Sequence, residues 1–189
     1  MPFTVTRVRT IGLAAALGAN VENNVWIVGE DAGLVIIDAA HDPAAIAAVV
    51  DHRRVHAIVC THGETDHINA AVELSAIVTA PIYLAAADRP RWDAVHPDHP
   101  PYDDLRDGDV FRVAGELMYV LPTPGVTPGG TSLYLPGPGM VFCGDSLCSA
   151  TAGSAAALLE LPAATVAHHA HGEDTTIGAE ADRLRAAAH

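Results

Sequence analysis

The segment Val55-His-Ala-Ile-Val-Cys-Thr-His-Gly-Glu-Thr-Asp-His67 joins a short, largely apolar strand directly to a turn that is rich in imidazole and carboxylate side chains. Because residues i and i+2 of an extended segment share a face, His62 and Glu64 are expected to point the same way, and Asp66 and His67 follow where a helix begins. Imidazole and carboxylate groups are common metal ligands. Their density exceeds what solvation of a turn requires, so the segment predicts a metal site at the end of a buried strand.

Further segments place polar side chains after predicted strands. They are Thr123-Pro-Gly-Val-Thr-Pro-Gly129, Val141-Phe-Cys-Gly-Asp145 and His168-His-Ala-His-Gly-Glu-Asp-Thr-Thr176. Loops that follow strands are common positions for functional residues, and one edge of a sheet sandwich can gather all of these segments. Within them, we interpret His168 and His169 as strand-end or surface histidines rather than as ligands.

Short strands and helices alternate along both halves of the chain. This alternation, with hairpins between some of the strands, predicts an α/β fold: two mixed β-sheets face to face with helices outside, a four-layer αββα sandwich. In the first half Asp42 and Pro43 are expected to cap and start a helix. The expected strands are 4–10, 24–28, 34–37, 55–60, 82–84, 110–113, 117–121, 132–135, 140–143 and 165–168, and the expected helices are 42–50, one ending near 78, 88–95, one near 158–159, and 177–188.

Length and composition restrict the class of protein. The chain has 189 residues, half of them hydrophobic, so we expect one domain, residues 1–189. A formal charge of −13 disfavours nucleic acid and membrane surfaces as partners. The three cysteines have no paired spacing, which favours a reducing, cytoplasmic location. Residues 7–20 are compatible with a short signal peptide, but we favour a strand and a small-residue loop.

In their order along the chain, these motifs resemble the metallo-β-lactamase superfamily, in particular its glyoxalase II-like thioester hydrolases. The usual first motif of that family, His-x-His-x-Asp-His, stands here as His62-Gly-Glu-Thr-Asp-His67, with Glu64 in place of the second histidine. The usual Thr-Pro-Gly-His-Thr-Pro-Gly has Val126 in place of its histidine. The Gly-Asp motif at Asp145 and the His-Gly motif at His171 are retained. The resemblance covers nearly the whole chain and implies the αββα sandwich.

The resemblance also implies a distribution of ligands over two metal positions. The first would be held by His62, Glu64 and Asp145, with the corner at Val126 lost. The second would be complete, with the ligands Asp66, His67, Asp145 and His171. We therefore expect one ion, at the second position, and regard a second ion as doubtful. Zinc is favoured, although a carboxylate-rich set also suits iron or manganese. The motif His-x-Glu-x-Asp-His itself resembles the flavodiiron branch, where the glutamate binds iron.

Three classes of function remain open. We favour a metal-dependent hydrolase of a small thioester or ester with an atypical, mononuclear site, in which Asp66, Glu64 and His62 are the catalytic residues and Glu64 or His62 is the general base. The alternatives are a non-hydrolytic enzyme of the same fold (an iron oxidoreductase, or a lyase or cyclase of a biosynthetic pathway) and a metal-poor pseudoenzyme. The expected partner is a small-molecule substrate. The oligomeric state, the substrate and the pathway are not predicted.

Overall fold

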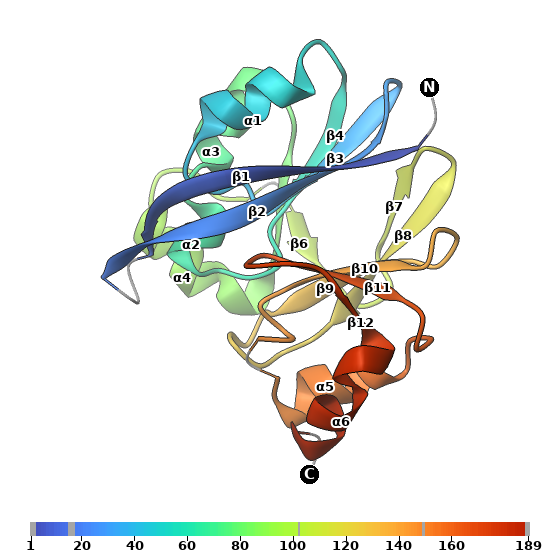
Figure 1. Ribbon diagram of the computed structural model, residues 1–189. Helices are drawn as coiled ribbons and strands as arrows, with labels where there is room; N and C mark the ends of the chain where they lie inside the picture. The colour runs from blue at the N-terminus through green and yellow to red at the C-terminus, as the bar shows by residue number, and fades with distance from the viewer. Residues whose placement is uncertain (1–2, 15–17, 102, 149, 188–189) are drawn as a thin grey trace.

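The computed structural model describes residues 3–14, 18–101, 103–148 and 150–187. It contains two six-stranded mixed sheets, with the strand orders β1-β2-β3-β4-β5-β6 and β12-β11-β10-β9-β8-β7 (Figure 1). The strands are β1 (Thr4–Ala14), β2 (Ala19–Glu30), β3 (Gly33–Ile37), β4 (Val55–Val59), β5 (Ile82–Ala85), β6 (Asp103–Leu105), β7 (Val110–Val113), β8 (Glu116–Pro122), β9 (Thr131–Leu135), β10 (Met140–Gly144), β11 (Val166–His169) and β12 (Thr175–Thr176). The helices are α1 (Pro43–Val50), α2 (Thr65–Ile68), α3 (Ala71–Val78), the 3-10 turn η1 (Ala86–Asp88), α4 (Arg89–Val95), α5 (Ala152–Leu159) and α6 (Ile177–Ala187).

Strand β3 shows why the sheets stack as they do. All of its residues are buried. Because successive side chains of a strand point to opposite faces, Leu34 and Ile36 belong to one core and Val35 and Ile37 to another. The first core lies between the β1–β6 sheet and helices α1 and α3, whereas the second lies between the two sheets. A strand buried on both faces is typical of the middle of a layered α/β fold.

Strand β10 is likewise buried on both faces, in the second sheet. Phe142 lies in the core between the sheets, while Val141 and Cys143 face the core formed with α5 and α6, where they meet Leu158 and Leu184. Helices α1 and α3 therefore cover one outer face and α5 and α6 the other, as Figure 1 shows. The predicted four-layer αββα sandwich of two mixed sheets is confirmed.

Local signals explain the element boundaries that the sequence predicted well. Asp42 Oδ1 accepts a hydrogen bond from Ala45 N at 2.9 Å, and Pro43 is the first residue of α1. The expected strands 4–10 and 24–28 are longer in the structure, because β1 and β2 pair antiparallel from Thr4 to Ala14. Strands β6 and β12 were not expected, since runs this short carry no readable periodicity.

The two sheets meet closely at the edge where β4 and β10 end. Thr131 N donates to the carbonyl oxygen of Thr61 at 2.8 Å, which joins β9 to the loop that follows β4. Gly144 has a φ of +50°, and a Cβ there would collide with Thr61 Oγ1. This position therefore requires glycine, and the loops after the two strands lie against each other.

The described helices include none that combines the length and the apolar composition needed to span a membrane. The cysteines Cys60 and Cys143 are buried and Cys148 is exposed, and all are free thiols. Burial raises the pKa of the Cys143 thiol, as expected for a small apolar residue in a strand.

Candidate metal centre

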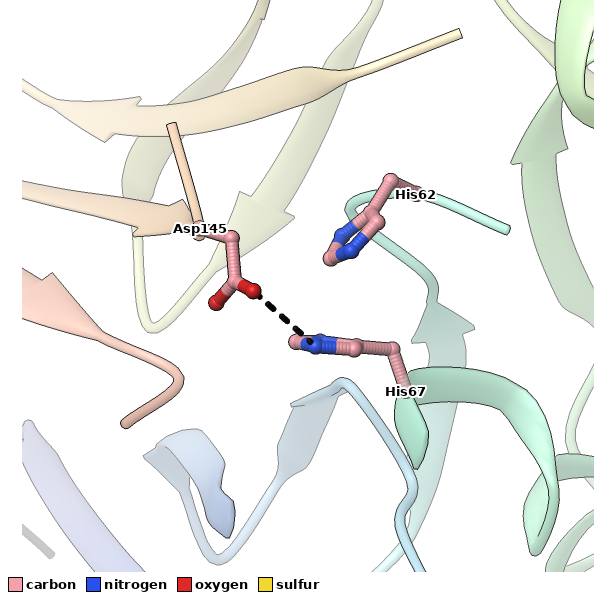
Figure 2. Close-up of side chains that lie close together, drawn as sticks. All are labelled: His62, His67 and Asp145. Carbon is pink, nitrogen blue, oxygen red and sulfur yellow. Dashed lines mark ion pairs between the residues drawn. The ribbon is translucent and has the colours of Figure 1, made fainter. Parts of the chain in front are cut away.

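The predicted ligands come from both sheets and gather at this edge. His62 follows β4, and Asp66 and His67 lie on the short helix α2. Asp145 follows β10, and His171 follows β11. In Figure 2, His62, His67 and Asp145 point toward one another across the gap between the sheets. The structure thus brings together side chains that lie more than a hundred residues apart in the chain.

The ligand atoms of the proposed second position lie close to one another in pairs. Asp66 Oδ2 lies 3.7 Å from His67 Nε2 and 3.5 Å from His171 Nε2. Asp145 Oδ2 lies 3.7 Å from His67 Nε2, and Asp145 Oδ1 lies 3.6 Å from His171 Nε2. Neighbouring ligand atoms at about 2.0–2.2 Å from a tetrahedral ion are roughly 3.3–3.6 Å apart. The observed spacings are therefore close to those of a loaded site.

Unpartnered buried atoms support the same conclusion. His62 Nε2, His67 Nε2 and Asp145 Oδ1 are buried and have no hydrogen-bond partner among the described residues. Leaving such atoms without a partner is costly, and a bound cation would satisfy all of them. Two groups of side chains have ligand atoms close enough to share an ion: Asp66, His67 and His171, and His62, His67 and Asp145. The donor set fits a divalent metal.

Each of the three histidines presents its Nε2 atom to this space, because its Nδ1 atom donates a hydrogen bond to another group. His67 Nδ1 donates to Asp38 Oδ2 at 3.1 Å. His171 Nδ1 donates to the carbonyl oxygen of Glu22 at 2.8 Å. His62 Nδ1 lies 3.0 Å from Thr61 Oγ1, whose own proton goes to Asp38. The hydrogen bonds therefore select one tautomer, with the Nε2 lone pair of each ring free to bind a metal.

Glu64 lies beside His62 but outside the two groups of possible ligands. Its Oε2 is 3.7 Å from His62 Nε2, but Glu64 belongs to neither group of side chains that could share an ion. The nearby His62 ring is the main cause that lowers the pKa of Glu64, so its carboxylate is charged at neutral pH. His62 forms a group of possible ligands with His67 and Asp145, whereas the resemblance implied His62, Glu64 and Asp145, and the role of Glu64 as a ligand stays a prediction.

Charge and burial act in opposite directions on the ligands. Burial tends to raise the pKa of Asp66, but hydrogen bonding to His171 and the charge of His67 lower it well below its usual range. Burial tends to lower the pKa of His67, but the hydrogen bond and charge of Asp38 raise it to about 9. The pKa of His171 is raised mainly by Asp66. Without an ion, the surrounding carboxylates therefore favour the protonated forms of the His67 and His171 imidazoles.

Asp38 is a site residue that the sequence interpretation missed. It is buried at the end of β3, where it accepts hydrogen bonds from Thr61 N at 2.7 Å, Thr61 Oγ1 at 2.8 Å and His67 Nδ1. A carboxylate bound to the second nitrogen of a metal-binding histidine fixes its ring and increases its basicity. The sequence signal that could have identified Asp38 is its position as a charged residue directly after the apolar strand that precedes α1.

A second chain of hydrogen bonds holds Asp66. Asn23 Nδ2 donates to the carbonyl oxygen of Asp66 at 2.9 Å and to its Oδ2 at 3.3 Å. The Oδ1 atom of Asn23 accepts from His41 Nε2 at 2.9 Å, and His41 Nδ1 accepts from Asn69 Nδ2 at 3.0 Å. Burial lowers the pKa of His41, consistent with a neutral ring in this chain. Asp66 is thereby held from outside the metal-facing space.

Asp88 joins the two loops that border the site. This buried carboxylate accepts hydrogen bonds from Gly63 N at 2.7 Å, Thr127 Oγ1 at 2.5 Å and Gly129 N at 2.8 Å. Gly63 belongs to the first motif, and Thr127 and Gly129 belong to the loop that contains Val126. Asp88 therefore fixes both loops without facing the ligands.

We expect Asp88→Asn to lower the free energy of unfolding by about 2–3 kcal/mol, because the amide leaves at least one buried donor unpaired. Urea denaturation of the metal-free protein measures this change without any contribution from an ion. Asp98→Asn, at an exposed loop position, is the matched control and should be nearly neutral. Equal stability of the two variants would contradict the proposed role of Asp88.

His168 and His169 lie at the end of β11, as the strand-end alternative predicted, but they are not at the surface. His168 and His169 are both 7% exposed. The His168 ring stacks on Phe142, with centroids 4.7 Å apart, and contacts Trp26. Burial lowers the pKa of both histidines. They are buried because β11 is covered on both faces, by the first sheet and by α5 and α6. Neither belongs to a group of possible ligands in the described chain.

The fold and these ligands define an αββα sandwich with a candidate metal centre at one sheet edge. The family model of the metallo-beta-lactamase superfamily matches residues 19–176. The chain belongs to the metallo-beta-lactamase superfamily, as the resemblance of its motifs indicated. Val126, at the position of the usual histidine, is half-buried in the loop held by Asp88.

Curated relatives and solved structures agree with this assignment. A hydroxyacylglutathione hydrolase of Acidiphilium cryptum is 34% identical over 155 residues, 80% of this chain and 56% of the relative. That of Rhodobacter capsulatus is 33% identical over 131 residues, 68% of this chain and 49% of the relative. The chain spans about half the length of these relatives. The structure of TTHA1623 in a di-iron-bound form is 28% identical, with a TM-score of 0.77 over 93% of this chain and 96% of that one.

Proposed function

We propose that this protein is a metal-dependent hydrolase of a small thioester or ester with an atypical, mononuclear metal site. The observation that carries the proposal is the group of ligand atoms from Asp66, His67 and His171, with Asp145 oxygens 3.7 Å from His67 Nε2 and 3.6 Å from His171 Nε2, and with buried nitrogen and oxygen atoms that lack partners among the described residues. The curated relatives named hydroxyacylglutathione hydrolase support hydrolysis of a thioester as the class of reaction. Because the chain spans about half of their length, the substrate of those relatives is not assumed here.

These same ligands would hold the ion, and we favour zinc with iron or manganese as alternatives. A divalent ion in such a site supplies Lewis acidity, which polarises a carbonyl group and makes water a better nucleophile at neutral pH. The buried rings of His62 and His67 exclude bulk water from one side of the site. The chain's own contribution is therefore to fix the ligands and to receive the proton that hydrolysis releases.

Glu64 is the side chain best placed to receive that proton. It borders the ligand cluster through His62 and belongs to neither possible ligand group. His62 is the second candidate for the general base, because its Nε2 is free and lies 3.7 Å from Glu64 Oε2. In this proposal Asp66 acts as a ligand that also orients the reacting groups.

We expect Glu64→Gln to reduce turnover of an ester or thioester by about 10²–10⁴-fold, the usual contribution of a general base. Glutamine keeps the size of the side chain but does not take up a proton. Metal content, measured by elemental analysis on the same samples, should stay at the wild-type value, because Glu64 lies outside both ligand groups. Turnover is measured with zinc-loaded protein and a panel of small esters and thioesters.

Glu160→Gln, at an exposed position after α5, is the matched control and should retain full activity. Unchanged turnover in Glu64→Gln would eliminate Glu64 as the general base. Loss of metal in that variant would instead make Glu64 a ligand. Stoichiometric metal in wild type without turnover of any tested ester would argue against the hydrolase.

The strongest alternative is a non-hydrolytic enzyme that uses iron. The di-iron-bound form of TTHA1623 supports it, because that protein is similar to this chain over nearly the whole length of both. A carboxylate-rich ligand set also suits iron. Iron in anaerobically purified protein, together with oxygen consumption, would favour this alternative. Absence of stoichiometric metal would favour the pseudoenzyme.

Other properties are proposed on the same basis. The partner is a small molecule, and neither nucleic acid nor membrane is expected to bind a chain with a net charge of −13. A cytoplasmic location is proposed from the free thiols.

A further inference from the structure

A small cavity adjoins the candidate metal centre on the side of α2 and α4. Its volume is about 170 Å³. A cavity of this size has room for a small substituent of a substrate bound at the metal centre. It is lined by Gly63, Glu64, Thr65, Asp66, Arg91, Ala94 and Val95. Through Glu64 and Asp66, the cavity borders the residues proposed for catalysis and metal binding.

Arg91 is distinctive among the residues that line this cavity. It is exposed and has no ion pair within the described part of the chain. Its neighbour Arg89 is occupied, because Arg89 Nε lies 2.7 Å from Asp93 Oδ1. The backbone of Arg91 is closely packed against the first motif: a Cβ at Gly63 would lie 2.9 Å from Arg91 Cβ. The base of this side chain is packed, and its guanidinium has no hydrogen bond or ion pair with the residues that the structure describes.

The positive charge of the unpaired Arg91 guanidinium determines which kind of ligand it can bind. Arg91 is the only positively charged residue among the described residues that line the cavity, which also contains two carboxylates. The chain has a formal charge of −13, so its general field repels anions. A guanidinium binds a carboxylate or a phosphate through paired hydrogen bonds, and Ala94 and Val95 provide an apolar wall for a short linker.

We propose that this cavity is a specificity subsite in which Arg91 binds an anionic group on the acyl part of the substrate. The substrate class is then a small ester or thioester whose acyl chain ends in a carboxylate or a phosphate-like group. The inference rests on the proposed hydrolase for its reaction, but the subsite itself needs only the cavity and Arg91.

The test compares three nitrophenyl esters of nearly equal size on zinc-loaded protein: the hemisuccinate, the corresponding phosphonate and the butyrate. We expect Arg91→Met to lower kcat/KM about 10–100-fold for whichever anionic ester is preferred, the usual effect of losing a hydrogen bond to a charged group. The neutral butyrate should be affected less than twofold. Arg91→Lys should restore part of the loss, mainly through KM. The ratio between hemisuccinate and phosphonate identifies the anion.

Arg112→Met is the matched control, since Arg112 is an exposed arginine on β7 that also lacks an ion pair in the described chain. Its kinetics should equal those of wild type. An equal loss on all three esters in Arg91→Met, or no loss on any, would overturn the subsite.

A binding measurement separates the subsite from the proposed reaction. Calorimetry with succinate and with phosphonopropionate on the zinc-loaded protein needs no turnover. Weaker binding of either anion to Arg91→Met than to wild type, without hydrolysis of any ester, would support the subsite and reject the hydrolase. Hydrolysis without any preference for anionic esters, and with equal anion binding by the two proteins, would reject the subsite and leave the hydrolase standing.

Discussion

Replacing His67 with alanine is expected to abolish stoichiometric metal binding and, with it, hydrolysis. His67 is the only side chain shared by the two groups of possible ligands in the described residues, so its loss leaves neither group complete. The effect should exceed the roughly 10–100-fold loss of metal affinity that follows removal of a partner beyond the ligands. Elemental analysis of protein purified with added zinc, followed by the ester assay, measures both consequences.

The control for this variant is His52→Ala. His52 is exposed, and within the described part of the chain its polar partner is Asp51, so its removal should leave the metal content unchanged. Because His67 is completely buried, circular dichroism is needed to show that His67→Ala is folded. A folded His67→Ala protein that keeps one ion per chain would show that the ligand assignment is wrong.

The second large effect is expected for Asp38→Asn, which we predict to weaken zinc binding about 10–100-fold. Asparagine tolerates the left-handed backbone conformation at this position, where φ is 55°, so the substitution changes charge rather than backbone. It removes the negative charge that orients His67 and raises its pKa. Competition with a chelator of known zinc affinity measures the change, and Asp31→Asn in the exposed β2–β3 turn is the control.

The pH dependence provides an independent check of the same contact. Because the pKa of His67 is raised to about 9, its imidazole holds a proton at pH 7.5 that zinc must displace. Zinc affinity should therefore rise with pH between about 7 and 9 and level off above that range. In Asp38→Asn the pKa of His67 falls and the slope should flatten. Equal slopes in wild type and variant would contradict the role of Asp38.

The sequence predicted the architecture well, because the signals for it are local. The apolar strand before His62, the Asp42-Pro43 helix start and the alternation of buried side chains each lie within a few residues. The ligands were assigned through the order of short motifs. The structure places Asp66, His67, Asp145 and His171 around one space, and their role as ligands remains a prediction.

The residues that support the ligands were not predictable in the same way. Asp38, Asn23 and Asp88 each act through a partner at least 23 residues away, and only the pairing of strands and loops brings them together. The position of Glu64 beside His62 agrees with the prediction that residues i and i+2 share a face, because Glu64 Oε2 lies 3.7 Å from His62 Nε2. The burial of His168 follows from the stacking of the sheets rather than from its own neighbours in sequence.

The hydrogen bonds of Asp88 also have a consequence for how the ligands of such a site can change during evolution. It holds the loop around Val126 through Thr127 and Gly129, with no contribution from the side chain at position 126. A histidine-to-valine exchange there changes the ligand set without removing what shapes the loop. The hydrogen bonds that hold the loop therefore do not depend on which side chain stands at position 126. A scaffold with this property can lose or regain a ligand in a single step, so metal number and reaction type can evolve separately from the fold.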